Sequence, residues 1–481
     1  MTESAKWAID PDRALPAEPA ARAVAREIYA AVAGLPIVSM HGHVEAEVFV
    51  DNDFFGDPAE LLITPDHYLV RMLVSQGYTP GQLGVASRHD LSLTEQEPRK
   101  IWRLFCENWK LFRGTPTRYW LEHELAVVFG TELQPSAATA DALYDQLAAS
   151  LRTEQFRPRA LLDRFNVEIL ATTDSALSDL SAHNKLSDLL VQGRVVPTFR
   201  PDSLLHVDHA RWSEEVRMLS EVSGVEVADY ASFLAALRQR RDAFLAAGAR
   251  ATDHGHLLAD TTPLPAPEAE RVFAAALRGE ATSEEAQAFS ANMLWEMARM
   301  SAEDGLVMQL HPGVLRNHCH GVYDSYGPDK GFDIPVKVEF TRSLRPLLES
   351  FGMSKDFRLI AFTTDETVYS RELAPLAGCY PAMKLGAPWW FLDSPEQMRR
   401  FRESAVETAG FYNTSGFVDD TRALASIPAR HDLSRRIDAG FLARLVGEGR
   451  LGLAEAVETA VDLTYNLPLQ SYAARTSGGK L

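Results

Sequence analysis

Short apolar segments recur along the chain, and most of them end in a polar or charged residue. Runs of this length that are rich in β-branched and aliphatic residues are typical of strands buried on both faces. We predict eight strands, at Pro36–Met40, Val167–Thr172, Val195–Phe199, Ala249–Thr252, Leu306–Leu310, Arg358–Phe362, Ala382–Leu385 and Gly416–Val418.

Between most of these strands, apolar residues recur at the spacing of an amphipathic helix. Clear examples cover Ala231–Ala247, Ser283–Ser301, Glu339–Phe351 and Pro395–Ala409. Alternation of strand and helix favours parallel βαβ units, and eight such units favour a closed barrel. We therefore predict an α/β protein built as a (β/α)8 TIM-like barrel.

The first two predicted strands are separated by far more than an ordinary βα connection of a few residues. We interpret residues 44–164 as a helical insertion that covers the carboxyl mouth of the barrel, with helices such as Glu97–Phe112 and Ala140–Thr153. A second insertion, residues 257–284, is rich in proline and alanine and is predicted to be peripheral.

The predicted barrel spans residues 35–475. Residues 1–34 form an N-terminal lead-in whose helix covers Leu15–Ala33, and residues 476–481 form a loose tail.

Composition narrows the function classes. The chain has 481 residues, of which 46% are hydrophobic and 24% are charged, as in soluble globular proteins. A formal net charge of −18 argues against nucleic acid or a membrane surface as a partner. No segment has the ~20 consecutive apolar residues of a membrane span, and we expect no export signal. Three cysteines, far apart and odd in number, predict a reducing compartment and hence the cytoplasm. The sequence leaves self-association into a homo-oligomer open.

The triplet His41-Gly42-His43 directly follows the first predicted strand. In an extended segment alternate side chains share a face, so both imidazoles would point the same way, and Gly42 leaves room for a close approach to the backbone. Two imidazoles at the carboxyl end of a buried strand form half of a divalent-metal site. The alternative is a pair of histidines that closes the strand and meets solvent.

Further polar and aromatic residues end the other strands, where the loops of a barrel converge. Asp174 and Asp202 are interpreted as N-caps of the following helices, and the pair Trp389-Trp390 as a lid or a substrate wall. The strand-end residues are His41 and His43, Thr173-Asp174, Arg200-Pro201-Asp202, Asp253-His254-Gly255-His256, His311, Thr364-Asp365, Trp389-Trp390 and Asp420-Thr421-Arg422.

Asp420 ends the last predicted strand and would face the first strand across the closure of the barrel. Two imidazoles and one carboxylate leave positions open on a metal ion, as in catalytic sites. Asp419 is a near-equal candidate because a register error of one residue would exchange the two. The alternative role for Asp420 is an ion pair with Arg422 or Arg435.

Two arginines at the mouth, Arg200 and Arg422, suggest recognition of an anionic group by their forked donors. The alternative is that each neutralises a nearby aspartate, such as Asp202 or Asp420. In the insertion, Asp66 is a candidate N-cap, followed by His67 and Tyr68, which are candidate proton carriers if the insertion covers the mouth.

Together these motifs resemble a known family. The His-x-His of the first strand and the aspartate of the last resemble the amidohydrolase superfamily of metal-dependent barrels, and the full ordered series resembles the uronate isomerase family. The motifs that carry this resemblance are His41-Gly42-His43, Asp66-His67-Tyr68 with Arg71, Thr172-Thr173-Asp174, Phe199-Arg200-Pro201-Asp202, Asp253-His254-Gly255, Met308-Gln309-Leu310-His311, Gly327-Pro328-Asp329, Gly331-Phe332-Asp333, Trp389-Trp390-Phe391 and Asp420-Thr421-Arg422.

The resemblance implies an aldose–ketose isomerase that interconverts D-glucuronate with D-fructuronate and D-galacturonate with D-tagaturonate through an enediol. It implies one divalent metal ion, zinc first and manganese second, held by His41, His43 and Asp420. It places Tyr68, Asp420 and Arg422 in the proton-transfer machinery, with Arg422 also lowering the pKa of Tyr68.

The resemblance also implies that Arg200 and His67 hold the hexuronate, that Trp389 or Trp390 forms a wall, and that His311 lies close to the site. No lysine ends the fourth strand, which argues against a two-metal centre. The main alternative is a mononuclear amidohydrolase acting on an anionic amide or ester, and a further one is a non-catalytic sensor of a sugar acid.

Overall fold

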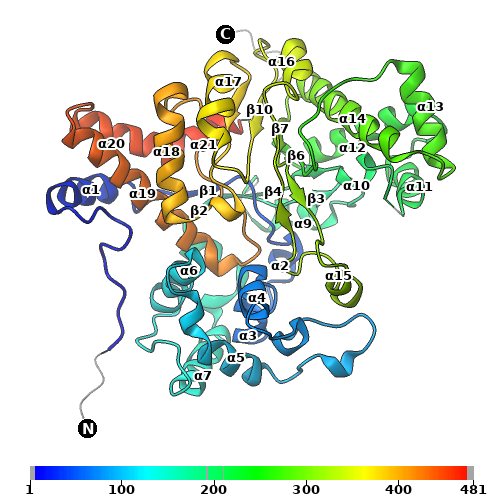
Figure 1. Ribbon diagram of the computed structural model, residues 1–481. Helices are drawn as coiled ribbons and strands as arrows, with labels where there is room; N and C mark the ends of the chain where they lie inside the picture. The colour runs from blue at the N-terminus through cyan, green and yellow to red at the C-terminus, as the bar shows by residue number, and fades with distance from the viewer. Residues whose placement is uncertain (1–5, 191–192, 210, 474–481) are drawn as a thin grey trace.

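The computed structural model describes residues 6–190, 193–209 and 211–473 (Figure 1). The protein is an α/β molecule in which parallel strands lie at the centre and helices surround them. The predicted tail, residues 476–481, lies outside the described residues. No described helix has both the length and the apolar character needed to cross a membrane.

The central strands all pair in parallel. Their order is β1-β2-β4 in one sheet and β11-β10-β7-β6-β5-β3 in the other. A separate antiparallel pair joins β8 (Val314–Leu315) and β9 (Ile334–Pro335). The central strands are β1 (Ile37–Ser39), β2 (Val167–Ala171), β3 (Asp174–Ser175), β4 (Val195–Val196), β5 (Phe199–Arg200), β6 (Ala251–His254), β7 (Val307–Leu310), β10 (Leu359–Ala361) and β11 (Met383–Leu385).

The two sheets are joined, because β3 continues β2 and β5 continues β4. Backbone amides of Leu170, Thr172, Asp174 and Ala176 donate in turn to carbonyls spaced two residues apart on the neighbouring strand, at 2.7 to 3.0 Å. The ladder therefore passes without a break from the first sheet to the second.

Residues 413–421 occupy the eighth strand position. This segment bonds to Leu385 of β11 through the amide of Ser415 (2.9 Å), and to His41 through the amide of Asp420 (3.1 Å). Hydrogen bonds on both sides give the parallel strands the circular order of a (β/α)8 barrel. The predicted strand Gly416–Val418 is wrong in one respect, because this segment has no regular strand geometry. Gly416, with φ of 82°, bends the chain where strand geometry would require an extended backbone.

Most predicted helices are present. Helix α12 (Tyr230–Ala246), α14 (Ser283–Asp304) and α18 (Pro395–Ala409) match within a few residues. The helix predicted over 339–351 begins only at α16 (Arg345–Phe351). The reason is a contact with a later part of the chain: the buried Glu372 carboxylate accepts hydrogen bonds from the amides of Phe340 and Thr341, which holds that turn outside a helix.

The segment between β1 and β2 is helical, and its hydrophobic core around Trp102 and Phe105 continues into the barrel at Ile37 and Val167. Its helices gather at one end of the strands, at the bottom of Figure 1. The helix predicted over 97–112 ends at Glu107, and a 3-10 turn follows. The helices of this segment are α2 (Ala46–Asp51), α3 (Pro58–Leu62), α4 (His67–Val74), α5 (Pro98–Glu107), α6 (Pro116–His123), α7 (Ala140–Leu151) and α8 (Pro158–Arg164).

The remaining helices cover the outside of the barrel. Helix α1 (Pro19–Val32), in the predicted lead-in, packs against α19 (Ile427–Gly447) and α20 (Leu453–Val461). Within the segment predicted to be peripheral, α13 (Ala266–Leu277) packs against α12 and α14 and buries Phe273. The domain boundaries stay predictions. The other helices are α9 (Ser181–Leu189), α10 (Asp202–Leu205), α11 (Trp212–Ser223), α15 (His320–Tyr326), α17 (Ala374–Cys379) and α21 (Leu467–Ser471).

Candidate active site

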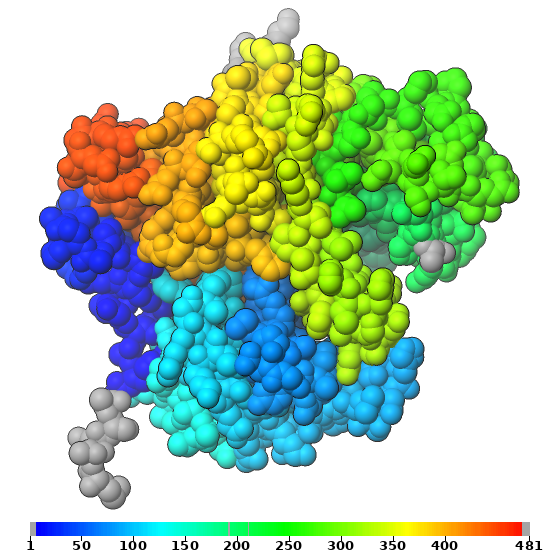
Figure 2. Space-filling model, viewed as in Figure 1, coloured from blue at the N-terminus to red at the C-terminus, as the bar shows by residue number. Residues whose placement is uncertain are grey.

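A cavity of about 310 Å³ lies where the carboxyl ends of the strands meet the insertion. Figure 2 shows the segment around α15 lying against the insertion, and the amide of Arg88 bonds to the carbonyl of Ser325 there (2.7 Å). The cavity brings together every site residue predicted from the sequence. These residues are His41, His43, His67, Tyr68, Arg200, His311, Trp389, Trp390, Asp420 and Arg422.

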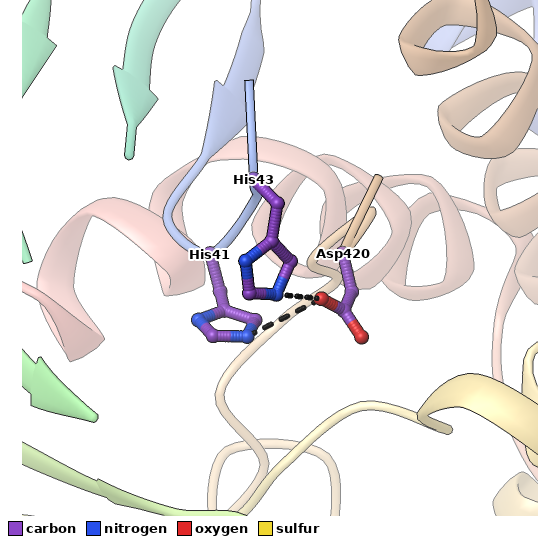
Figure 3. A group of neighbouring side chains, drawn as sticks. All are labelled: His41, His43 and Asp420. Carbon is purple, nitrogen blue, oxygen red and sulfur yellow. Dashed lines mark ion pairs between the residues drawn. The ribbon is translucent and has the colours of Figure 1, made fainter. Parts of the chain in front are cut away.

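His41, His43 and Asp420 converge on one point of this cavity (Figure 3). The Oδ1 atom of Asp420 lies 3.4 Å from Nε2 of His41 and 2.9 Å from Nε2 of His43. This oxygen is buried and accepts no hydrogen bond, so its lone pairs are left to whatever occupies that point.

The backbone fixes these three side chains. The amide of Asp420 donates to the carbonyl of His41, and the amide of His43 donates to the carbonyl of Thr421 (2.9 Å). Asp420 has φ of 44° and Trp390 has φ of 53°, a left-handed conformation that costs free energy in residues with a side chain. The indole Nε1 of Trp389 donates to Oδ2 of Asp420 at 2.6 Å, which orients the carboxylate.

The alternatives for Asp420 can be compared directly. Asp419 points away from the cavity, where its Oδ2 lies 3.0 Å from Nε2 of the buried His431. Arg422 pairs with Asp329 (3.0 Å) rather than with Asp420, and Arg435 donates to backbone carbonyls. Of the two adjacent aspartates, Asp420 is therefore the one beside the histidines.

No described protein atom crowds the backbone at Gly42. A Cβ atom there would lie 3.4 Å from the nearest atom, Oδ1 of Asp419, which is ordinary contact. Gly42 thus has no steric role in placing the two imidazoles; the alternation of an extended backbone is sufficient.

The side chains around Asp420 favour its ionised form. Burial alone would raise the pKa of Asp420, but the adjacent His41 and His43 outweigh it and hold that pKa well below its usual value. Burial lowers the pKa of His43, which favours the neutral imidazole that binds metals.

His311 and Asp253 stand behind the first group. His311 stacks on His41 with ring centroids 4.4 Å apart, and its Nδ1 lies 2.7 Å from Oδ1 of Asp253. Nε2 of His311 is buried and has no hydrogen-bond partner. His41, Asp253 and His311 therefore form a second group of atoms close enough to share a cation.

Arg200 links this group to the loops beyond it. Its Nη1 lies 3.2 Å from Oδ2 of Asp253, and its Nε donates to Oδ2 of Asp202 at 3.0 Å. The guanidinium is thus shared by two carboxylates, one of which is the neighbour that the sequence offered as an alternative. Burial would raise the pKa of Asp253, but Arg200, His311 and His41 together hold it well below its usual value.

Two N-cap predictions are wrong. Asp174 lies on β3, where its Oδ2 accepts a hydrogen bond from Thr172, and Asp202 is the first residue of α10 and caps nothing. The fourth predicted strand is also displaced: β6 runs through Asp253 and His254, so both lie within the strand rather than after it.

The insertion supplies the opposite wall of the cavity. Asp66 caps α4 as predicted, accepting hydrogen bonds from the amides of Tyr68 and Leu69. His67 and Tyr68 follow it, their rings stacked with centroids 4.7 Å apart. Gly331, with φ of 85°, packs so closely on α4 that a Cβ atom would lie 2.9 Å from the carbonyl oxygen of His67.

Sequence reasoning missed two buried residues behind Tyr68. The Tyr68 hydroxyl donates to Oδ2 of Asp393 at 3.2 Å, and Nη1 of Arg430 donates to the same oxygen at 2.7 Å. Arg430 lies in the first turn of α19 and Asp393 directly follows a 3-10 turn, and neither carries a local signal. Only their burial in the fold, at 3% and 5% exposure, marks them out.

This wall disfavours charge on its titratable groups. Burial raises the pKa of Tyr68 well above its usual value and lowers the pKa of His67 to about 3. Burial also raises the pKa of Asp393 to about 7, although Arg430 opposes it. The cations that moderate the pKa of Tyr68 include Arg430 and Arg71. The role that the resemblance implies for Arg422 at Tyr68 stays a prediction.

A third wall carries charges of both signs. Arg316 pairs with Asp333 (2.9 Å) and lies 5.1 Å from the ring centroid of Trp390. Arg422 pairs with Asp329, whose pKa falls to about 2 because these cations outweigh its burial. The guanidinium groups of Arg316 and Arg422 keep more than a third of their side-chain surface exposed and can meet an anion.

The donor set fits a divalent ion. Two imidazole nitrogens and one carboxylate oxygen, each available at one point, are ligands that zinc and manganese accept, and three protein ligands leave positions open. The fold and this donor group are typical of metal-dependent α/β barrels that carry their chemistry at the carboxyl ends of the strands.

Comparison with known proteins narrows that class. A family model described as glucuronate isomerase matches residues 20–472. A uronate isomerase of Rhizobium meliloti (strain 1021) is 52% identical over 96% of this chain and 99% of its own. The crystal structure of glucuronate isomerase from Caulobacter crescentus has a TM-score of 0.94 and 49% identity, covering 98% of both chains. That of a uronate isomerase from Thermotoga maritima has a TM-score of 0.89 and 28% identity, covering 97% of this chain and 99% of the other.

The chain therefore belongs to the glucuronate isomerase family.

Proposed function

We propose that the protein is a uronate isomerase that converts D-glucuronate to D-fructuronate, D-galacturonate to D-tagaturonate, or both. The observation that carries this proposal is the cavity, in which a His-His-Asp group faces a buried tyrosine across a space of sugar size. Full-length similarity to uronate isomerases supports it.

The reaction moves a hydrogen from C2 to C1 of the open-chain sugar acid. A base must take the C2 proton, an acid must return a proton, and the negative charge that develops on the enediol oxygens must be stabilised. A single divalent ion, zinc first and manganese second, held by His41, His43 and Asp420 would supply Lewis-acid stabilisation of a sugar oxygen.

Tyr68 is the proposed carrier of one proton. Its raised pKa keeps the phenol protonated, and its hydroxyl already donates to the Asp393 carboxylate. Burial raises the pKa of Asp393 to about 7, so its carboxylate can accept the phenolic proton near neutral pH. Arg430 holds this carboxylate in place. We assign Asp420 the other proton step, as the carboxylate nearest the histidines.

The remaining predicted residues would bind the substrate. Arg422 is proposed to stabilise the developing oxyanion, while Arg200 and His67 hold hydroxyl or carboxylate groups. Trp389 and Trp390 would form the wall against which the sugar lies, and His311, stacked on His41, would border the reacting end.

The alternative reaction, hydrolysis of an anionic amide or ester, uses the same donor set. Incubation of the protein with D-glucuronate or D-galacturonate, with NMR detection of the ketose, distinguishes isomerisation from hydrolysis. Isomerisation in D2O should exchange deuterium into product at the carbon that receives the proton. Turnover of an N-acyl amino acid with no turnover of either hexuronate would reject the proposal in favour of a hydrolase, and uronate binding without exchange would indicate a sensor.

We further propose a cytoplasmic location. Cys106, Cys319 and Cys379 are all free, which suits a reducing compartment. Self-association into a homo-oligomer is likewise a proposal, and light scattering on the purified protein tests it.

A further inference from the structure

A second cluster of metal-ligand side chains lies outside the cavity of the proposed active site. Asp202 and His206 come from the start and the end of α10, and His256 follows β6 by two residues. One ligand atom from each lies within 4.8 Å of those of the other two. None of the three lines the cavity that holds Asp420.

His256 has no hydrogen-bonding role in the fold. Its side chain is 3% exposed, yet neither ring nitrogen has a partner. Leaving a buried polar group without a partner is unfavourable, so His256 calls for a ligand that the described side chains and backbone do not provide. Burial also lowers the pKa of His256 well below its usual value, which favours the neutral imidazole that binds metals.

His206 completes the pair of imidazoles. Its ring centroid lies 4.6 Å from that of His256, and its Nδ1 lies 3.4 Å from the hydroxyl of Ser290. In the tautomer whose Nδ1–H donates to Ser290, Nε2 holds the free lone pair, the arrangement in which an outer hydrogen bond orients a metal-binding histidine.

The two carboxylate oxygens of Asp202 have different surroundings. Oδ2 accepts hydrogen bonds from the amide of Gly255 (2.9 Å) and from Arg200, whereas Oδ1 is buried and has no partner. Arg200 is shared with Asp253, so two carboxylates face one guanidinium and a further cation meets an excess of negative charge.

We propose that Asp202, His206 and His256 bind a second divalent transition-metal ion, of the zinc class. Two imidazole nitrogens and one carboxylate oxygen select such an ion over magnesium or calcium, which prefer all-oxygen ligands. The half-buried Asp202 and His206 leave the site open to exchange with solvent. The ion would hold the loops after β5 and β6 together and, through Asp202, hold Arg200.

The test is the zinc content of purified protein that has been incubated with Zn²⁺ and dialysed, measured by mass spectrometry. We expect two equivalents per chain in the unmodified protein. His206→Asn and His256→Gln should each bind one, as should a His41→Ala/His43→Ala variant, and combining His43→Ala with His206→Asn should leave neither site intact.

His209→Asn is the matched control, because His209 is exposed in the same loop and lies outside the cluster. It should keep two equivalents. Circular dichroism and the melting temperature establish that each variant is folded. If His256→Gln fails to fold, His206→Asn decides, because that residue is half-buried.

Cobalt gives an independent readout. In the His41→Ala/His43→Ala background, Co²⁺ should produce visible absorption that saturates at one equivalent and disappears when His206→Asn is added. Folded His206→Asn protein with the same zinc content as His209→Asn, or a double-histidine variant that binds no metal, would overturn the second site.

The proposed isomerase activity and the second site fail separately. A protein with two zinc equivalents and no hexuronate turnover rejects the activity and keeps the site. If the activity holds, loss of this ion should raise KM for the hexuronate more than it lowers kcat, because Arg200 is proposed to bind substrate rather than to transfer protons.

Discussion

The two facing walls of the cavity treat charge in opposite ways. On the barrel wall, imidazoles and Arg200 hold the pKa values of Asp420 and Asp253 well below the usual range. On the insertion wall, burial raises the pKa of Asp393 to about 7 and that of Tyr68 well above its usual value. The surroundings differ: imidazoles and the Arg200 guanidinium lie against the first pair of carboxylates, whereas burial outweighs the nearby Arg430 and Arg71 at Tyr68.

This contrast assigns the walls different chemistry. A wall that keeps carboxylates ionised can bind a cation. A wall whose groups are neutral, or have a pKa near 7, can donate and accept protons. An enediol reaction needs both, on opposite sides of the substrate. Tyr68 comes from the insertion, whereas Asp393 and Arg430 behind it come from the loop after β11 and from α19. Arg430 also donates to the backbone carbonyl of Asp419 at 3.2 Å, which joins the two walls behind the cavity.

The largest effect should come from the barrel wall. Asp420→Asn removes the carboxylate that lies beside both histidines, and we expect the bound metal at that point to be lost. Because loss of outer partners of a metal ligand already costs about 10–100-fold in affinity or activity, loss of a ligand should exceed that range. Metal content and hexuronate turnover, measured together, check this.

Asp365→Asn is the control for that variant, since Asp365 also follows a strand but does not line the cavity. It should keep both metal and rate. Full metal content and full rate in Asp420→Asn would contradict the assignment of the barrel wall.

The insertion wall should respond differently. Tyr68→Phe is expected to lower kcat by about 10²–10⁴-fold, the usual contribution of a general acid or base, while metal content stays unchanged. Tyr323→Phe, on the exposed surface of α15, is the matched control. Loss of metal in Tyr68→Phe would show that the two walls are not separable.

Asp393 supports Tyr68 and sharpens the same comparison. If the ionised carboxylate is the form that accepts the Tyr68 hydroxyl, kcat of the unmodified enzyme should rise with pH through about 7, the pKa of Asp393. Asp393→Asn should flatten that limb and lower kcat less than Tyr68→Phe does. A limb that persists in the Asp393→Asn protein would assign it to another group.

The strand-end residues and the insertion residues His67 and Tyr68 were accessible to sequence reasoning, whereas the two residues behind Tyr68 were not. His41, His43, His311 and Asp420 each follow an apolar segment, so the periodicity that predicts a strand also predicts where the side chain arrives. Asp393 and Arg430 have no such marker. In the sequence Arg430 resembles Arg435 and Arg436 of the same helix, and only the fold places it against Tyr68.

Errors in strand limits had physical causes as well. The eighth position lost its regular strand geometry at Gly416, and the amides of Phe340 and Thr341 bond to Glu372 from a distant part of the sequence. A local pattern cannot reveal a partner 30 residues away. Asp202, taken as a cap, instead joins Arg200 to a loop from the next strand.

The smallest effect concerns stability and tests whether the insertion wall disfavours charge as a region. Glu124 is buried there, and burial raises its pKa to about 8, with the nearby Asp66 adding to the shift. Its folded-state pKa lies above the unfolded value, so the folded protein binds the proton more tightly. The resulting stabilisation is present below the unfolded pKa of about 4.5 and is lost as pH rises toward about 8.

Glu124→Gln removes the titration, so the melting temperature of the variant relative to the unmodified protein should increase between about pH 5 and about pH 8. Glu122→Gln, on the neighbouring turn and partly exposed, should show no such trend. A constant difference across this range would mean that the charge of Glu124 is compensated inside the fold, and the contrast between the walls would then be confined to the residues around Tyr68.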